Sequence, residues 1–238
     1  MITTLILATA MATAQQPATT NKTYLLGFHA DWCGKCKALE PKVMGAEKDL
    51  MKAGIEMVVI DRTDADTEKK SLEAAKKLKL DGFAKQFTGT GYGVLINARD
   101  MRVVSKVTSE MTTEQITTAA KVAAEKRNTK LYAVAFHADW CPGCQQLGPK
   151  LMPHMKDLGS MGAEMIKLDY TSDETTKTIA EQAKWLGIAD VVGKNPGTGK
   201  VLLIDPVTKK VVGQIGADVE ASRIPAIVKA ALAKTQSH

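Results

Sequence analysis

The residues with the clearest chemistry in this chain are its four cysteines, which form two Cys-x-x-Cys pairs. Residues 28–36 read Phe-His-Ala-Asp-Trp-Cys-Gly-Lys-Cys, and residues 136–144 read Phe-His-Ala-Asp-Trp-Cys-Pro-Gly-Cys. The six residues up to the first cysteine are identical, and the two segments lie 108 residues apart. Because every cysteine belongs to one of these pairs, the pattern predicts dithiol chemistry at two sites.

The repeat also divides the chain. At 238 residues the chain is long enough for two small domains, and the 108-residue repeat favours this division over one large domain. We expect a leader over residues 1–21, a first unit over residues 22–127 and a second over residues 128–238. A hydrophobic content of 45% and a charged content of 24% are typical of globular proteins.

The net charge of +6 does not predict nucleic-acid binding, because the lysines are spread along both units without interleaved aromatic residues. The densest group of lysines lies on one predicted helix beside Glu68 and Glu73. At these spacings opposite charges support a solvated helix face. A preference for acidic partner proteins is the alternative interpretation.

The N-terminus has the pattern of an export signal. The first twenty residues carry no charged side chain, and a short apolar run ends in Ala12-Thr13-Ala14. This predicts a signal peptide cleaved after Ala14 and a periplasmic or secreted protein. A cytoplasmic protein is the alternative, since no Lys or Arg precedes the run. No other stretch reaches the roughly 18 apolar residues of a membrane span, so none is expected.

Strands and helices alternate within each unit. Apolar patterns predict strands over residues 23–30, 55–60, 94–97 and 103–107 and helices over residues 36–51, 67–79 and 112–127. Pro41 is expected to kink the first helix. The second unit repeats this order, with strands over residues 163–168, 201–205 and 211–215 and helices over residues 174–186 and 219–234. The order predicts an α/β fold with a mixed central sheet covered on both faces.

This order of elements resembles the thioredoxin family. The family pattern is Trp-Cys-x-x-Cys after the first strand, here with Trp32 and Trp140, and a proline eight residues past the first cysteine. The resemblance covers residues 23–234, twice, and implies two thioredoxin-like three-layer α/β/α sandwiches in tandem. It also implies that Cys33 and Cys141 attack and that the second cysteines, Cys36 and Cys144, resolve mixed disulfides.

The physical basis of these roles is the start of a helix. A cysteine there faces unpaired backbone N–H groups and the positive end of the helix dipole, which lower its pKa. We expect the leading thiols to be exposed and ionised, and the second thiols to be more buried. Lys35 adds a cation to the first site, whereas Pro142 and Gly143 occupy the second. We therefore expect the two reduction potentials to differ by more than about 10 mV.

The first departure from the thioredoxin pattern is a missing acid. The family's buried acid, six residues before the first cysteine, is replaced by Gly27 and Ala135. His29 and His137 lie nearby, and an imidazole titrates near neutrality, so either could accept a proton. The alternative is that each ring packs as a substitute for an aromatic residue.

The second departure is a missing cis-proline, which in the family faces the dithiol. Strand alignment puts its place at or near Gly93 in the first unit and at Gly199 or Lys200 in the second. We expect these glycines to line the substrate groove. The resemblance implies that loss of this proline weakens substrate binding and favours metal binding.

We predict an enzyme, a thiol–disulfide oxidoreductase that acts on protein thiols and exchanges electrons with an upstream redox partner. No cofactor or metal is expected besides the redox-active disulfides. Metal handling is the first alternative, because paired thiolates bind copper(I) or zinc, and methionines near Cys144 add soft donors. Core packing explains these methionines more simply. A thioredoxin-like binding module with structural disulfides is the second alternative.

Overall fold

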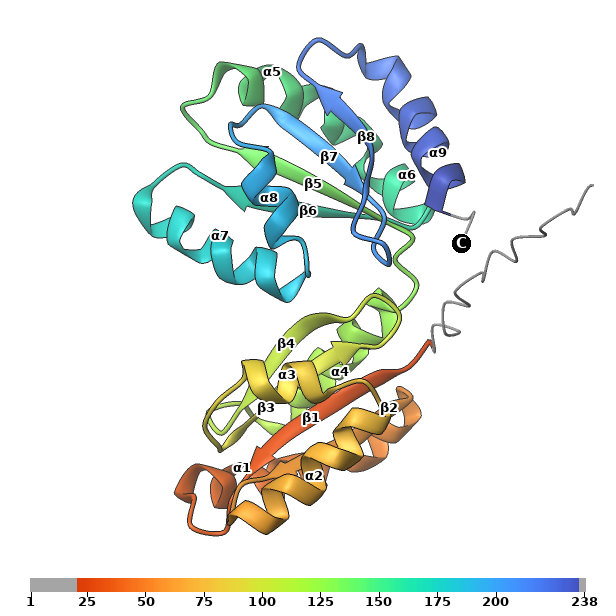
Figure 1. Ribbon diagram of the computed structural model, residues 1–238. Helices are drawn as coiled ribbons and strands as arrows, with labels where there is room; N and C mark the ends of the chain where they lie inside the picture. The colour runs from red at the N-terminus through yellow and green to blue at the C-terminus, as the bar shows by residue number, and fades with distance from the viewer. Residues whose placement is uncertain (1–20, 236–238) are drawn as a thin grey trace, which may run out of the picture.

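The computed structural model describes residues 21–235, which form two four-stranded sheets flanked by helices (Figure 1). The predicted leader over residues 1–21 therefore lies almost entirely outside the described residues. Within residues 21–235, no helix is long and apolar enough to cross a bilayer. The predicted α/β class, with two tandem three-layer sandwiches and mixed sheets, is confirmed.

The first sheet has the strand order β2-β1-β3-β4. Strands β1 and β2 are parallel, whereas β3 is antiparallel to both β1 and β4. The elements are β1 (Thr23–His29), α1 (Gly34–Lys52), β2 (Ile55–Asp61), α2 (Ala65–Lys77), α3 (Asp81–Gln86), β3 (Tyr92–Asn97), β4 (Arg102–Thr108) and α4 (Thr113–Lys126).

The second sheet repeats this topology with the order β6-β5-β7-β8. Its pairings have the same parallel and antiparallel senses as those of the first sheet. The elements are β5 (Leu131–His137), α5 (Pro142–Leu151), η1 (Met152–His154), α6 (Met155–Ser160), β6 (Ala163–Asp169), α7 (Asp173–Trp185), α8 (Ala189–Lys194), β7 (Lys200–Ile204), β8 (Val211–Gly216), η2 (Ala221–Arg223) and α9 (Ile224–Thr235).

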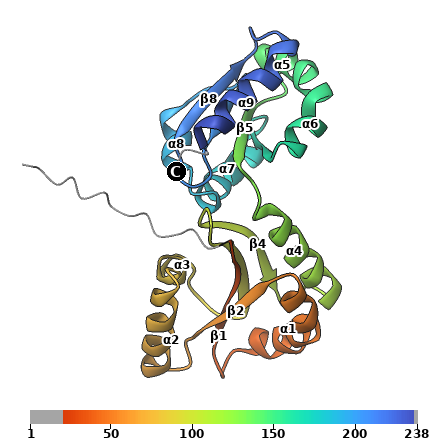
Figure 2. The ribbon, with the colours of Figure 1, turned by 90° about the vertical axis from the view of Figure 1, so that its right-hand side faces the viewer.

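Each sheet is covered on both faces. In Figure 2, α1 and α4 lie on one side of the first sheet and α2 and α3 on the other. Side chains alternate along a strand, so Leu25 packs in the core under α1 and α4 while Leu26 and Phe28 pack in the core under α2 and α3. All three side chains are buried. The second unit has two equivalent cores.

Local sequence explains where several helices begin. Asp64, Thr112 and Ser172 each cap a helix N-terminus, and each forms a reciprocal capping box with the residue three positions on. These side chains satisfy backbone N–H groups that have no partner within the helix. The caps fix the start of α2, α4 and α7.

The structure differs from the sequence-based expectation in its short helices. The six-residue helices α3 and α8, which precede the glycine loops, were not predicted. Helix α1 runs from Gly34 to Lys52 with Pro41 inside it, whereas its counterpart is divided into α5, η1 and α6. The division contains Pro153, which has no proline counterpart in the first unit, where Gly45 occupies that position.

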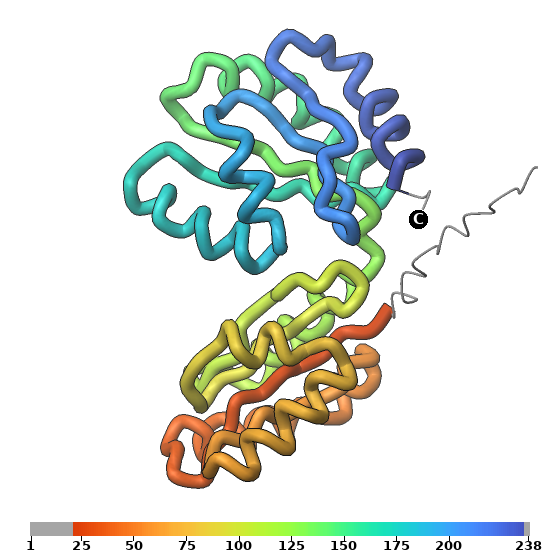
Figure 3. The backbone as a smooth tube through the Cα atoms, in the orientation of Figure 1, coloured from red at the N-terminus to blue at the C-terminus, as the bar shows by residue number. Residues whose placement is uncertain are grey.

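The chain passes between the two units over a short connection (Figure 3). Helix α4 ends at Lys126 and strand β5 begins at Leu131. Trp185, at the end of α7, packs against the core of the first unit. The two units are therefore in contact through side chains as well as through the connection.

Candidate active site

Each leading cysteine is the N-cap of a helix. Cys33 precedes α1 and Cys141 precedes α5, and both have an extended backbone conformation. The Cys33 sulfur accepts a hydrogen bond from the Cys36 backbone N–H at 3.1 Å, and the Cys141 sulfur accepts one from the Cys144 N–H at 3.2 Å. These donors stabilise negative charge on the leading sulfur.

The second site holds two thiols with opposite pKa shifts. Burial alone would raise the pKa of Cys141, but hydrogen bonds from Cys144, Thr198 and Gly143 outweigh it, so the pKa is lowered from 9.0. Burial raises the pKa of Cys144, and its hydrogen bond to Cys141 raises it further. The leading thiol therefore ionises first. At the first site, Cys33 and Cys36 are joined as a disulfide.

The leading cysteines are less accessible than the sequence suggested. Cys33 is 7% exposed and Cys141 is 6% exposed, close to the 4% and 6% of Cys36 and Cys144. The expectation that the leading cysteines are exposed is therefore wrong, whereas Cys36 is slightly less exposed than Cys33, and Cys141 and Cys144 are equally exposed. The reason is that the glycine loop before β3 or β7 packs directly over the leading sulfur.

The tryptophans beside the dithiols are exposed, and each is held by one hydrogen bond. The Trp32 indole N–H donates to the Thr63 carbonyl oxygen at 3.3 Å, and the Trp140 indole N–H donates to the Thr171 carbonyl oxygen at 3.2 Å. Sequence reasoning missed both threonines. Both threonines follow the second strand of their unit at equivalent positions, and this repetition could have identified them.

The two histidines pair with aspartates of the same motif. The Nε2 atom of His29 lies 3.2 Å from Oδ1 of Asp31, and that of His137 lies 2.9 Å from Oδ1 of Asp139. Among residues 21–235, neither imidazole forms a hydrogen bond with a cysteine sulfur. His29 nevertheless lines the same cavity as Cys36, so it lies in the neighbourhood of the buried sulfur.

The residue that faces the dithiol of the first unit is Gly91. Its φ of +85° is a left-handed conformation, and an added Cβ would lie 2.5 Å from the Lys35 Cβ and 3.2 Å from the Cys33 sulfur. Gly199 holds the equivalent place, with φ of +81° and an added Cβ 3.4 Å from the Cys141 sulfur. Both glycines donate a backbone N–H to the first strand of their sheet.

The assignment of Gly93 to this place is a register error of two residues. Gly93 lies within β3, paired with Gly27, and an added Cβ there would meet Leu25 and Leu26 rather than a cysteine. The sequence has glycine at both 91 and 93, so the strand alignment chose the wrong one. The 108-residue offset from Gly199 identifies Gly91 correctly.

The residues between the cysteines lie on the first turn of each helix. Lys35 is exposed, and its Cβ is in the place that a side chain at Gly91 would need. Pro142 is the first residue of α5, where the absent N–H costs nothing, and it is exposed. Across the part of the chain that the structure describes, no group of three His, Cys, Asp or Glu side chains is arranged to hold a metal ion.

Comparison with known proteins identifies the family. The thioredoxin family model matches residues 7–83 and 108–184, and the chain belongs to the thioredoxin family. It is 27% identical over 172 residues to a probable protein disulfide-isomerase A4 from Caenorhabditis elegans. It is 29% identical over 141 residues to the Schizosaccharomyces pombe protein disulfide-isomerase C17H9.14c.

Each match involves only a part of the relative's length. They cover 66% and 52% of this chain, but the chain spans only 26% and 38% of the two relatives. Among solved structures, the first two thioredoxin domains of Saccharomyces cerevisiae Eps1p align over 79% of this chain and 83% of that one, with 13% identity and a TM-score of 0.34.

Proposed function

We propose that the chain is a thiol–disulfide oxidoreductase that exchanges disulfides with protein thiols at both Cys-x-x-Cys sites. The observation that carries this proposal is the opposite shift of the two thiol pKa values at the reduced site. A leading thiol of lowered pKa supplies the attacking thiolate, and a neighbour of raised pKa stays protonated until it is needed.

The exchange has two steps. The Cys141 thiolate attacks one sulfur of a client disulfide, which forms a mixed disulfide and releases the other client sulfur as a thiolate. Cys144 then loses its proton and attacks the Cys141 sulfur. This step forms the Cys141–Cys144 disulfide and releases the second client thiol, so two electrons pass to the client. The reverse sequence oxidises a client dithiol, and Cys33 and Cys36 act in the same way.

The supporting residues have distinct places in this proposal. Thr198 donates a hydrogen bond to the Cys141 sulfur and so favours the thiolate. Trp32 and Trp140 offer exposed aromatic surface beside the sulfur to a client polypeptide. Gly91 and Gly199 lie directly beside the leading sulfur, where a client polypeptide would approach it. His29 and His137 remain candidate proton acceptors.

The partners we propose are client proteins and an upstream redox protein that resets each dithiol. The export pattern before residue 21, together with the similarity to protein disulfide-isomerases, supports a site of action in the periplasm or outside the cell. We divide the chain into units 22–127 and 128–238, with the boundary in the connection between α4 and β5.

The test uses exchange with a small disulfide such as oxidised glutathione. The parent protein should react, and the double variant Cys33→Ser, Cys141→Ser should lose activity by a factor on the order of 10³ or more. The matched variant Cys36→Ser, Cys144→Ser keeps both attacking thiols and should accumulate mixed disulfides, which identify clients by mass spectrometry. A parent protein that binds about one copper(I) per cysteine pair and exchanges no disulfide would instead be a metal carrier.

A further inference from the structure

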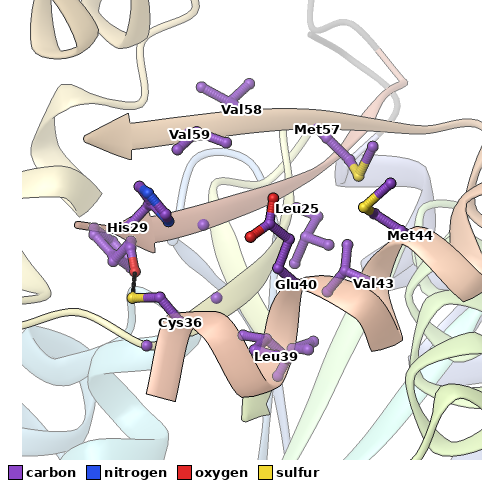
Figure 4. A pocket seen from close by; sticks show the side chains of 15 residues that line it. Leu25, His29, Cys36, Leu39, Glu40, Val43, Met44, Met57, Val58 and Val59 are labelled. Carbon is purple, nitrogen blue, oxygen red and sulfur yellow. Dashed lines mark hydrogen bonds between the residues drawn. The ribbon is translucent and has the colours of Figure 1, made fainter. Parts of the chain in front are cut away.

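The first unit contains an open cavity next to its dithiol (Figure 4). The cavity has a volume of about 400 Å³ and lies between α1 and the strands β1 and β2. In Figure 4, Cys36 and His29 lie at one end of it and Met44 and Met57 at the other. Its volume falls in the range in which proteins bind ligands, and its walls are mostly apolar.

Two facing glycines open the inner wall of this cavity. Gly27 on β1 pairs with Gly93 on β3, and both residues line the cavity. The equivalent pair in the second sheet is Ala135 with Val201, and Val201 is fully buried. The second unit therefore places a methyl and an isopropyl group where the first unit has none.

The mouth of the cavity also differs between the units. Met44 and Met57 are exposed, and Val59 is 54% exposed, so three apolar side chains meet solvent together. The residue of the second unit that corresponds to Val59 by strand register is Lys167, whose ammonium lies 2.8 Å from Asp169. The first unit thus has an apolar entrance, whereas the second has a paired cation there.

We propose that this cavity is a subsite of the first dithiol that receives a large apolar side chain of the client polypeptide. The occupant follows from continuity with the dithiol, because Cys36 forms part of the cavity wall and Gly91, which faces Cys33, forms another part. A polypeptide held at Cys33 is thereby beside the cavity. Among the described residues that line it, Glu40 and His29 carry the only titratable groups, since Cys36 is in the disulfide, and the Glu40 carboxylate disfavours anionic occupants. The proposal rests on the proposed exchange activity and adds a client preference to it.

The test uses the full chain with Cys141→Ser and Cys144→Ser, so that only the first dithiol reacts. Two peptides each carry one cysteine as a mixed disulfide with glutathione and differ only in a leucine or a serine beside that cysteine. With the Cys33–Cys36 dithiol reduced beforehand by dithiothreitol, the leucine peptide should react with a second-order rate constant about 10-fold or more higher, which is the expected gain from burying one such side chain. Equal rates for the two peptides would overturn the subsite.

Two substitutions introduce the residues of the second unit at the cavity and so test whether the cavity causes the leucine preference. Val59→Lys places a cation at the mouth, and Asp61 stands two residues on, as Asp169 does after Lys167. Gly27→Ala adds a methyl group whose nearest neighbour is the Val58 carbonyl oxygen at 3.9 Å, so it fits the fold. Both should remove the leucine preference while the serine peptide and oxidised glutathione react at the parent rate.

The controls separate this inference from the function itself. A parent protein that exchanges neither peptide nor glutathione contradicts the proposed oxidoreductase. Variants that slow the serine peptide as much as the leucine peptide would show that the substitutions act on the dithiol, which would overturn the subsite alone.

A second inference comes from a different observation, the buried ion pairs between the units. Glu164 on β6 accepts a hydrogen bond from Arg102 of β4 at 2.6 Å and pairs with Lys126 of α4 at 2.8 Å. Arg102 is only 1% exposed. The Tyr132 hydroxyl of β5 donates to the Asp100 carboxylate at 2.6 Å. Separating the two units would leave buried charges without their partners. Such a cluster therefore holds the units together.

The two hairpin turns also meet at this junction. The Lys209 ammonium, from the turn between β7 and β8, donates to the Asp100 carbonyl oxygen at 2.7 Å and to the Leu186 carbonyl oxygen at 2.8 Å. Arg99 donates to the Thr129 carbonyl oxygen at 2.8 Å. The junction therefore involves strands, turns and the connection between the units.

These contacts lie at the ends of the sheets opposite the dithiols. Strands β1 and β5 both begin near the junction and run away from it, and the cysteines follow their far ends (Figure 1). Each strand has seven residues and spans about 23 Å, and the two strands run apart from the junction, so each dithiol lies at the far end of its own sheet. A disulfide between two cysteines needs Cα atoms within about 7 Å of each other.

We infer that the two dithiols do not exchange with each other within one folded chain. The test oxidises the variant Cys36→Ser, Cys144→Ser with diamide at low protein concentration. The folded protein should form no Cys33–Cys141 bond within the monomer, whereas the same protein in denaturant should form it. An intramolecular cross-link of the folded monomer, found by peptide mass spectrometry, would overturn the inference.

Discussion

The two units carry the same six-residue motif and the same sheet order, yet their surroundings differ at particular points beyond the motif. In both, a cysteine caps a helix, a tryptophan donates to a threonine carbonyl, and a left-handed glycine lies over the leading sulfur. The first unit adds an apolar cavity beside the dithiol. The second adds paired charges that face the first unit.

The difference teaches which features a short motif controls. Contacts between residues close in sequence, such as the sulfur of Cys33 with the N–H of Cys36, recur in both copies within about 0.1 Å. Long-range features that depend on a single residue which differs between the units do not recur. Gly27 and Ala135 occupy the same place in β1 and β5, and they decide whether a cavity wall is open or filled.

The largest expected effect is a difference in stability loss between substitutions at two equivalent glutamates, Glu56 and Glu164. Glu56 pairs with Lys22 at 2.9 Å on the surface, whereas Glu164 pairs with Arg102 and Lys126 in the buried junction. Glu164→Ala should lower the free energy of unfolding by about 3 kcal/mol, because it leaves Arg102 buried with less compensation. Glu56→Ala should cost no more than about 1 kcal/mol. Chemical denaturation measures both, and equal losses would contradict a buried junction.

The same pair predicts a difference in pH dependence. Burial alone would raise the pKa of Glu164, but Arg102 and Lys126 outweigh it and the pKa lies below 4.5. A carboxyl group with a lowered folded pKa stabilises the protein above its unfolded pKa, and this contribution is lost as the pH falls through the folded value. The stability gap between parent and Glu164→Gln should therefore shrink below about pH 4.5. A gap that widens in acid would contradict this assignment.

An intermediate effect should distinguish the two glycines that cover the dithiols. An added methyl group at Gly91 would lie 2.5 Å from the Lys35 Cβ, whereas at Gly199 its nearest neighbour would be the Gly143 Cα at 3.3 Å. Both positions also impose a left-handed strain of about 1–3 kcal/mol on a non-glycine residue. Gly91→Ala should therefore destabilise more than Gly199→Ala. Thermal unfolding of the reduced proteins compares them, and the reverse order would contradict the tighter packing of the first site.

The smallest expected effect is a shift in the pKa of Cys141, the leading thiol of the second site. Thr198→Ala removes a hydrogen bond to the Cys141 sulfur, one of the contacts that lower its pKa. Losing one bond of about 1 kcal/mol should raise that pKa by less than about one unit. The pH dependence of alkylation by iodoacetamide measures the shift. Thr90→Ala is the matched variant in the first unit, and comparing the two shifts shows how far the reduced sites resemble each other.

Much of the fold could be predicted from sequence because its signals are local or repeated. Apolar runs such as Leu25 to Phe28 predicted the buried strands, and the 108-residue offset predicted a second copy of each element. The short helices α3 and α8 were missed because six residues are too few for a periodic pattern. Gly91 was missed because a strand alignment of short segments tolerates a shift of two residues.

The sequence by itself determined the chemistry: four cysteines in two pairs, each placed where a strand gives way to a helix, because the motif specifies its own hydrogen bonds. The tertiary structure alone decided how accessible each sulfur is, since the loop that covers Cys33 comes from Gly91, more than fifty residues away. It also decided that Arg102 and Glu164 meet. Such contacts depend on how sheets and helices pack in space, and no spacing along the chain encodes that packing directly.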